Sequence, residues 1–85
     1  MSAKVEVYST TYCPYCRAAE GLLNAKGVSY ALIDVTQDPE KRAWLVQATG
    51  QSTVPQTFIN DLSVGGFTDL QALDRAGKLD ELLNL

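Results

Sequence analysis

Alternating polar and apolar residues predict the first strand of this chain. Residues 4–8 are Lys-Val-Glu-Val-Tyr, and a period of two is typical of a strand with one buried face. From Pro14 onward the apolar positions change to helical spacing, with Ala19 and Leu23 on one face. Gly27 is a suitable C-terminal cap for this helix. The chain is therefore expected to begin with a strand and a helix.

The middle of the chain predicts a second strand and a second helix. The strand is expected over residues 28–35, because apolar side chains dominate this stretch. Its candidates for burial are Tyr30, Leu32 and Ile33. Asp38 is a favourable N-cap, since a proline and a glutamate follow it. The helix is expected to end at Gly50, with Trp44 partly packed on the sheet.

The last third predicts a hairpin and a closing helical region. Residues 58–59 belong to a third strand, and the Asn-Asp pair at 60–61 is a two-residue hairpin signal. The fourth strand breaks at the glycines 65–66. Residues 68–71, Thr-Asp-Leu-Gln, predict a capping box with the threonine as N-cap and the glutamine reaching back. Leucines within 79–83 suit a short amphipathic turn that closes the core.

The order of elements is thus β-α-β-α-β-β-α. Two strands joined by a helix should be parallel with a right-handed crossover, whereas the last two strands should form an antiparallel hairpin. The expected fold is α/β, with a mixed four-stranded sheet and helices on both faces. We expect a single domain over residues 1–85.

Composition excludes several classes of function. A net charge of −3, a pI near 4.6 and no basic cluster beyond Lys41-Arg42 argue against a nucleic-acid partner. No apolar run reaches transmembrane length, and the N-terminus carries no apolar signal region. We therefore expect a cytoplasmic protein without membrane contact.

The two cysteines of the chain, Cys13 and Cys16, stand between the first strand and the helix that follows it. The first sulfur should lie at the helix N-terminus, where free N–H groups and the helix dipole favour a thiolate. Pro14 fits the first helical position. The second cysteine lies three residues on, on the same helical face, within reach of the first. This arrangement indicates thiol–disulfide chemistry.

Three other interpretations of the cysteine pair are weaker. A structural zinc site needs four ligands, and the chain has two cysteines and no histidine. A purely structural disulfide would close a very small loop and stabilise the fold little. Two inert buried thiols would not explain the placement between a strand and a helix.

Two further segments could bind a substrate. One interpretation of Thr53-Val54-Pro55 is purely structural: a proline at the first residue of a strand. The alternative is a cis-proline turn beside the cysteines, which exposes Val54 backbone groups to a peptide-like substrate. The residues around Thr68 could serve only to cap a helix. Alternatively, the helix N-terminus could bind a substrate carboxylate while Asp69 accepts a hydrogen bond from a substrate ammonium.

Taken together, residues 13–16, 53–55 and 65–70 resemble the dithiol glutaredoxins of the Cys-Pro-Tyr-Cys type, and the similarity spans the whole chain. The resemblance implies a thioredoxin fold with cis-Pro55. It implies reduction of protein disulfides and of glutathione mixed disulfides, with glutathione as the reductant and no metal in the dithiol form. The implied partners are glutathione, protein disulfides and glutathionylated proteins, and the implied state is a monomer.

The resemblance also implies roles for individual residues. Cys13 would be the nucleophile and Cys16 the resolving thiol, and the two would form the redox-active disulfide. Val54 would pair its backbone with the cysteinyl unit of glutathione, while Thr68 and Asp69 would hold the γ-glutamyl end. The residues expected to contact glutathione are Tyr15, Thr53, Val54, Pro55, Gly66, Thr68 and Asp69.

Two positions differ from the usual family pattern. Many glutaredoxins carry a lysine three residues before the nucleophile, where this chain has Thr10. Many also carry a basic residue shortly before Thr-Val-Pro, where this chain has Gln51 and Ser52. Because those cations would face the glycyl carboxylate or support the thiolate, Thr10 and Gln51 are further candidates for substrate contact.

Two alternative functions stay open. The first is a small redoxin reduced by a flavoprotein reductase, which the missing cations favour and the Thr68-Asp69 pocket disfavours. The second is a scaffold in which Cys13 of two chains and two glutathiones ligate a [2Fe–2S] cluster. A visible absorption spectrum would separate the cluster from a dithiol.

Overall fold

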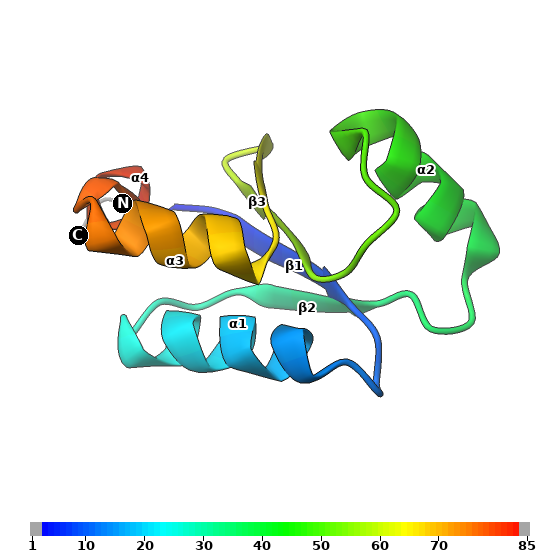
Figure 1. The fold of residues 1–85 in the computed structure, drawn as a ribbon, viewed down its shortest axis with the longest axis horizontal. Helices are drawn as coiled ribbons and strands as arrows, with labels where there is room; N and C mark the ends of the chain where they lie inside the picture. Colours follow the sequence, from blue (N-terminus) through cyan, green and yellow to red (C-terminus); the bar gives the residue numbers. More distant parts are fainter. Residues whose placement is uncertain (1–2, 84–85) are drawn as a thin grey trace.

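Strand β1 (Val5–Ser9) is one of the two inner strands of the sheet in the computed structural model, which describes residues 3–83 (Figure 1). The other elements are α1 (Pro14–Ala25), β2 (Ala31–Asp34), α2 (Pro39–Thr49), β3 (Gln56–Ile59), β4 (Leu62–Gly65), α3 (Phe67–Arg75) and α4 (Lys78–Leu83). The strand order is β2-β1-β3-β4. The β1–β2 pair is parallel, and the β1–β3 and β3–β4 pairs are antiparallel. The predicted mixed four-stranded sheet is confirmed.

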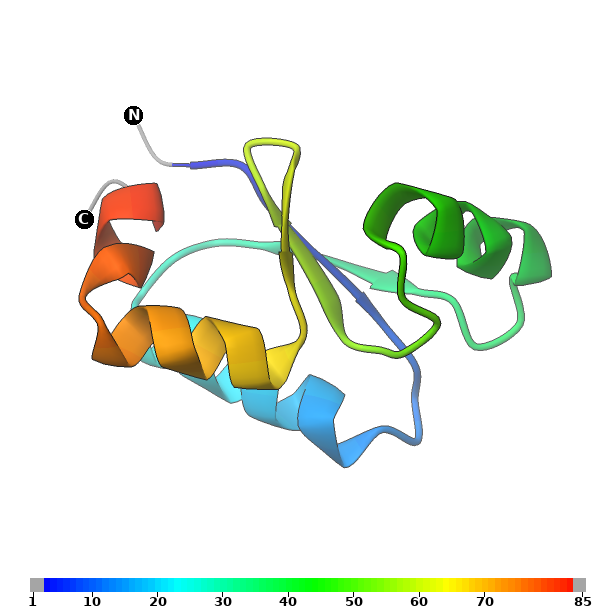
Figure 2. The same ribbon diagram turned by 45° about the horizontal axis from the view of Figure 1, so that its top comes forward.

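Helices cover both faces of the sheet because successive strand residues point to opposite sides. Val5 and Val7 of β1 belong to a buried cluster that also contains side chains of α1, α3 and α4. Tyr8 belongs to a second cluster with Phe58 of β3 and Leu45 of α2. Figures 1 and 2 accordingly show α1 and α3 on one side of the strands and α2 on the other.

Strand register brings three distant segments to one end of the sheet. Tyr8 of β1 pairs with Gln56 of β3, so the chain leaving β1 lies beside the chain entering β3. Thr57 of β3 pairs with Gly65 of β4, so the start of α3 follows at the same end. The cysteine segment, the Thr-Val-Pro segment and the glycine pair therefore converge, although Cys13 and Gly66 are 53 positions apart in the sequence.

The predicted helix cap at Asp38 and the predicted hairpin turn at residues 60–61 are confirmed. The Asp38 side chain accepts a hydrogen bond from the Lys41 N–H at 3.0 Å and caps α2. Asn60 and Asp61 have positive φ values of 51° and 67°, as a tight hairpin turn requires. Trp44 is half-exposed, and its ring lies 5.5 Å from the ring of Tyr8, between centroids. It packs on the sheet as predicted.

The second strand differs from its prediction in length and burial. Strand β2 covers four residues of the expected 28–35. Leu32 was a wrong candidate for burial, since 46% of it is exposed. The reason is that β2 is an edge strand, whereas the helices pack chiefly over β1 and β3. Tyr30 and Ile33 are half-buried, and Val35, just beyond the strand, is fully buried.

Among the described residues 3–83, none of the helices combines the length and the apolar character needed to cross a membrane.

Candidate active site

Cys13 is the N-cap residue of α1. Its backbone is extended, with φ −98° and ψ 112°, and its Sγ accepts a hydrogen bond from the Cys16 N–H at 3.2 Å. Pro14 occupies the first helical position, where a missing N–H costs no hydrogen bond. The Cys13 sulfur therefore receives a helix N–H at the positive end of the helix dipole.

Cys16 is the buried member of the pair. Its side chain is fully buried, and the structure holds both cysteines as free thiols. Burial raises the pKa of Cys16 from 9.0 to about 11, and a hydrogen bond with Cys13 adds to the increase. Cys16 therefore stays protonated near neutral pH, while Cys13 is partly accessible.

The Thr-Val-Pro segment lies directly against Cys13. The Val54–Pro55 peptide bond is cis, as the resemblance implied. The Cys13 thiol donates to the Val54 carbonyl across 3.6 Å. Because only the protonated sulfur can donate, loss of the proton releases this carbonyl.

Gln56 fastens the loop that precedes Pro55. Its side chain is fully buried, and its Nε2 donates to Gln51 Oε1 and to the Thr53 carbonyl, both at 3.0 Å. A third contact joins Nε2 to the Thr53 hydroxyl at 3.3 Å. One buried amide therefore positions two residues of the loop. Buried amides of this kind hold their partners because leaving them unpaired is costly.

Helix α3 begins two residues earlier than predicted. Its N-cap is Gly66, and the Asp69 carboxylate reaches back to accept from the Gly66 N–H at 3.1 Å. The predicted capping box with Thr68 as N-cap and Gln71 as its partner is therefore wrong. The same three-residue spacing occurs at 66–69, but a glycine N-cap has no side chain by which sequence reasoning would identify it.

Glycines allow this helix start to approach Pro55 closely. Gly65 has φ +93°, and a Cβ there would collide with the Asp69 carboxylate. A Cβ on Gly66 would lie 3.2 Å from the Pro55 carbonyl oxygen. A side chain at Gly65 would therefore displace the Asp69 carboxylate that caps α3, and a side chain at Gly66 would crowd the Pro55 carbonyl.

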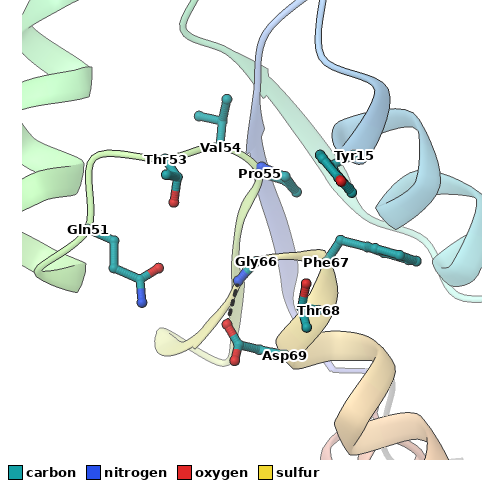
Figure 3. Close-up of a pocket in the computed structure, with 9 residues that line it drawn as sticks. All are labelled: Tyr15, Gln51, Thr53, Val54, Pro55, Gly66, Phe67, Thr68 and Asp69. Carbon is teal, nitrogen blue, oxygen red and sulfur yellow. Dashed lines mark hydrogen bonds between the residues drawn. The ribbon is translucent and has the colours of Figure 1, made fainter.

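A pocket of about 290 Å³ lies between these segments (Figure 3). Its walls are Tyr15, Gln51, Thr53, Val54, Pro55, Gly66, Phe67, Thr68 and Asp69. All seven residues expected to contact a ligand are among them, together with the further candidate Gln51. Figure 3 shows Gln51 and Tyr15 on opposite sides of the pocket.

Phe67 is the pocket residue that sequence reasoning missed. Its ring lies 6.4 Å from that of Tyr15, between centroids, and the two rings form one wall. The available signal was an aromatic residue directly after a glycine pair, inside the segment 65–70 that carries the resemblance. The pattern alone did not distinguish it from a core residue.

The structure does not bring Thr10 into the pocket. Its side chain is fully buried just after β1, and its carbonyl accepts from Arg17 Nη2 at 3.3 Å. Arg17 also pairs with Glu20 at 2.8 Å, within α1. Thr10 thus supports the turn before the cysteines from inside the fold.

Within residues 3–83, no group of three or more His, Cys, Asp or Glu side chains could hold a metal ion.

A thiol pair placed in this way, in a sheet of this topology, defines the thioredoxin-like class of thiol–disulfide oxidoreductases. Within that class the chain belongs to the glutaredoxin family, whose family model matches residues 5–64. It is 50% identical over 80 residues to a glutaredoxin of Pseudomonas aeruginosa, covering 94% of this chain and 95% of that protein. It is 44% identical over 81 residues to glutaredoxin 3 of Escherichia coli K12, covering 95% and 98%.

Solved structures agree with this assignment. A buckwheat glutaredoxin–glutathione complex matches with a TM-score of 0.92 and 35% identity, over 96% of this chain and 77% of that one. The glutaredoxin of Brucella melitensis matches with a TM-score of 0.87 and 44% identity, over 96% and 89%. The predicted thioredoxin-like fold is confirmed.

The difference in burial between the cysteines predicts selective alkylation. At about pH 8 iodoacetamide should modify Cys13 and leave Cys16 unlabelled, because a buried thiol with a pKa of about 11 is protonated there. Labelling of Cys16 should rise as the pH approaches that pKa. Peptide mass spectrometry of the reduced protein measures both sites.

Protein unfolded in urea provides the control for this experiment, since both cysteines should then react at similar rates. Equal labelling of the two cysteines in the folded protein would contradict the assigned environments.

Proposed function

We propose that this glutaredoxin reduces glutathione mixed disulfides and protein disulfides, with glutathione as its reductant. The observation that carries the proposal is the pocket beside Cys13, whose walls come from the Thr-Val-Pro segment and from the start of α3. A pocket of about 290 Å³ suits a small peptide. The existence of a glutathione complex of the buckwheat relative supports this choice of ligand.

The groups around the pocket suit the parts of glutathione. The Val54 backbone lies beside Cys13, and there it would pair with the cysteinyl unit. The start of α3 offers the hydroxyl of Thr68 and backbone N–H groups to the α-carboxylate of the γ-glutamyl end. One Asp69 oxygen caps Gly66, which leaves the other to accept from the α-ammonium.

With a glutathione mixed disulfide, the reaction would need one enzyme thiol. The Cys13 thiolate attacks the glutathione sulfur, the original S–S bond breaks, and the partner leaves as a thiolate that takes up a proton. A second glutathione thiolate then attacks the sulfur of the enzyme-bound glutathione. This step forms oxidised glutathione and restores the Cys13 thiolate.

With a protein disulfide, both enzyme thiols would take part. Cys13 attacks one sulfur of the substrate and forms a mixed disulfide, releasing the other substrate thiol. Cys16 then loses its proton and attacks the Cys13 sulfur, which releases the reduced substrate and leaves a Cys13–Cys16 disulfide. Two glutathione molecules reduce this disulfide and become oxidised glutathione. The protonated, buried state of Cys16 keeps it from competing in the first step.

The other sequence-based expectations are carried forward as part of the proposal. They are a cytoplasmic location, a monomeric state and one domain over residues 1–85, of which residues 1–2 and 84–85 lie outside the described part.

Serine substitutions should separate the roles of the two cysteines. Cys16→Ser should keep the removal of glutathione from a mixed disulfide, because a second glutathione resolves the intermediate, and should lose most reduction of a protein disulfide. Cys13→Ser should lose both activities. Rates with a glutathionylated peptide and with a disulfide-bonded protein measure the two routes, and deglutathionylation that survives in Cys13→Ser would refute the assignment.

Asp69→Asn should lower activity selectively on substrates that carry a γ-glutamyl group. The substitution removes the negative charge that faces the ammonium but keeps an oxygen that can accept from the Gly66 N–H. We expect kcat/KM for a glutathione mixed disulfide to fall roughly five- to thirtyfold. The rate with bis(2-hydroxyethyl) disulfide should change little.

Asp61→Asn is the matched control, because it removes the same charge at an exposed hairpin residue that does not line the pocket. If Asp69→Asn lowered the rates with both substrates equally, Asp69 would act only on the helix start.

A further inference from the structure

The pocket wall carries a single charged side chain, and it is negative. Of the nine residues that line the pocket, Asp69 is the only acidic one, and none is a lysine, arginine or histidine. Glutathione carries one ammonium and two carboxylates, so it is an anion overall. In the proposed orientation Asp69 and the start of α3 engage the ammonium and one of the carboxylates. The glycyl carboxylate is left without a cation on the wall.

Arg17, which directly follows Cys16 in the sequence, does not supply a cation to the pocket wall. Arg17 donates to the Thr10 carbonyl and pairs with Glu20, and it is not among the residues of the pocket wall. Thr10 itself is fully buried. Neither residue therefore brings a positive charge to the pocket wall.

Gln51 instead presents a neutral donor there. It lines the pocket on the side away from Tyr15 (Figure 3), and its Oε1 accepts from the buried Nε2 of Gln56 at 3.0 Å. This bond fixes which way the Gln51 amide faces. The hydrogen bonds between described residues leave the Gln51 amide nitrogen without an acceptor, so it is free to donate to a ligand.

Building on the proposed function, we infer that Gln51 makes the glycyl end of the pocket indifferent to charge. A neutral N–H donates to a carboxylate oxygen and to a carboxamide oxygen in the same geometry. The substrates of this chain accordingly include γ-glutamyl-cysteinyl disulfides whose terminal carboxylate is amidated, as well as glutathione disulfides. The γ-glutamyl end, held by Asp69 and the start of α3, supplies the selectivity.

A single-turnover experiment tests this assignment. The full chain with Cys16→Ser is reacted with three symmetrical disulfides: glutathione disulfide, its derivative with both glycyl carboxylates amidated, and bis(2-hydroxyethyl) disulfide. Cys13 attacks one sulfur, one thiol is released, and the protein mixed disulfide is followed by mass. Each rate constant is divided by that of the same disulfide with 2-mercaptoethanol, which removes differences in leaving-group reactivity.

With Gln51 present, the two tripeptide disulfides should react within about threefold of each other, and both should react faster than the hydroxyethyl disulfide. Gln51→Lys should raise the rate constant for glutathione disulfide about two- to fivefold, as expected for a partly exposed ion pair. That gain should vanish at about 1 M salt and be absent with the amidated disulfide. Gln47→Lys, an exposed α2 residue outside the pocket wall, adds the same charge and should give no gain.

The alternative results distinguish a failure of the inference about Gln51 from a failure of the proposed function. The inference about Gln51 would be wrong if the protein with Gln51 preferred glutathione disulfide over its amidated derivative by tenfold or more. It would also be wrong if Gln51→Lys raised the rates with both tripeptide disulfides equally, or raised neither. In both cases the proposed function would stand. If neither tripeptide disulfide exceeded the hydroxyethyl disulfide, the glutathione pocket itself would be wrong, and the inference with it.

Discussion

Pairing between β1 and β3 is the constraint on which the site depends. The antiparallel register places Tyr8 opposite Gln56, so the chain that leaves β1 toward Cys13 runs beside the chain that enters β3 from Pro55. The hairpin to β4 then returns the chain to the same end of the sheet. A shift of this register by one residue would turn Val7 and Tyr8 to the opposite faces. The buried clusters on both faces therefore also fix the position of the pocket.

This geometry assigns different chemistry to two identical side chains. Cys13 lies at a helix start, partly accessible, with an N–H donor on its sulfur and the Val54 carbonyl beside it. Cys16, three residues later, faces inward, and burial keeps it protonated. The proposed order of events in a thiol–disulfide exchange rests on this difference in position along one turn of α1. The loop held by Gln56 and the helix start held by Asp69 contribute walls of the adjacent pocket.

Most of the fold and the placement of the two cysteines could be predicted from the sequence because their signals are local. The cysteine spacing, the Asp38 cap and the hairpin turn each depend on a few adjacent residues. The predictions that failed depended on tertiary contacts. Leu32 could not be placed at an exposed edge without the strand order, and the cap at Gly66 has no side chain to reveal it. The burial of Thr10 and the entry of Phe67 into the pocket likewise depend on neighbours that are distant in sequence.

The central proposal is that segments from three parts of the chain form one glutathione pocket beside Cys13. Amide chemical shifts of ¹⁵N-labelled Cys16→Ser protein, compared before and after formation of its mixed disulfide with glutathione, test it most directly. The account predicts large changes at Val54, Thr68 and Asp69 as well as around Cys13. Changes confined to the first turns of α1 would show that glutathione does not occupy the pocket, and would contradict the account.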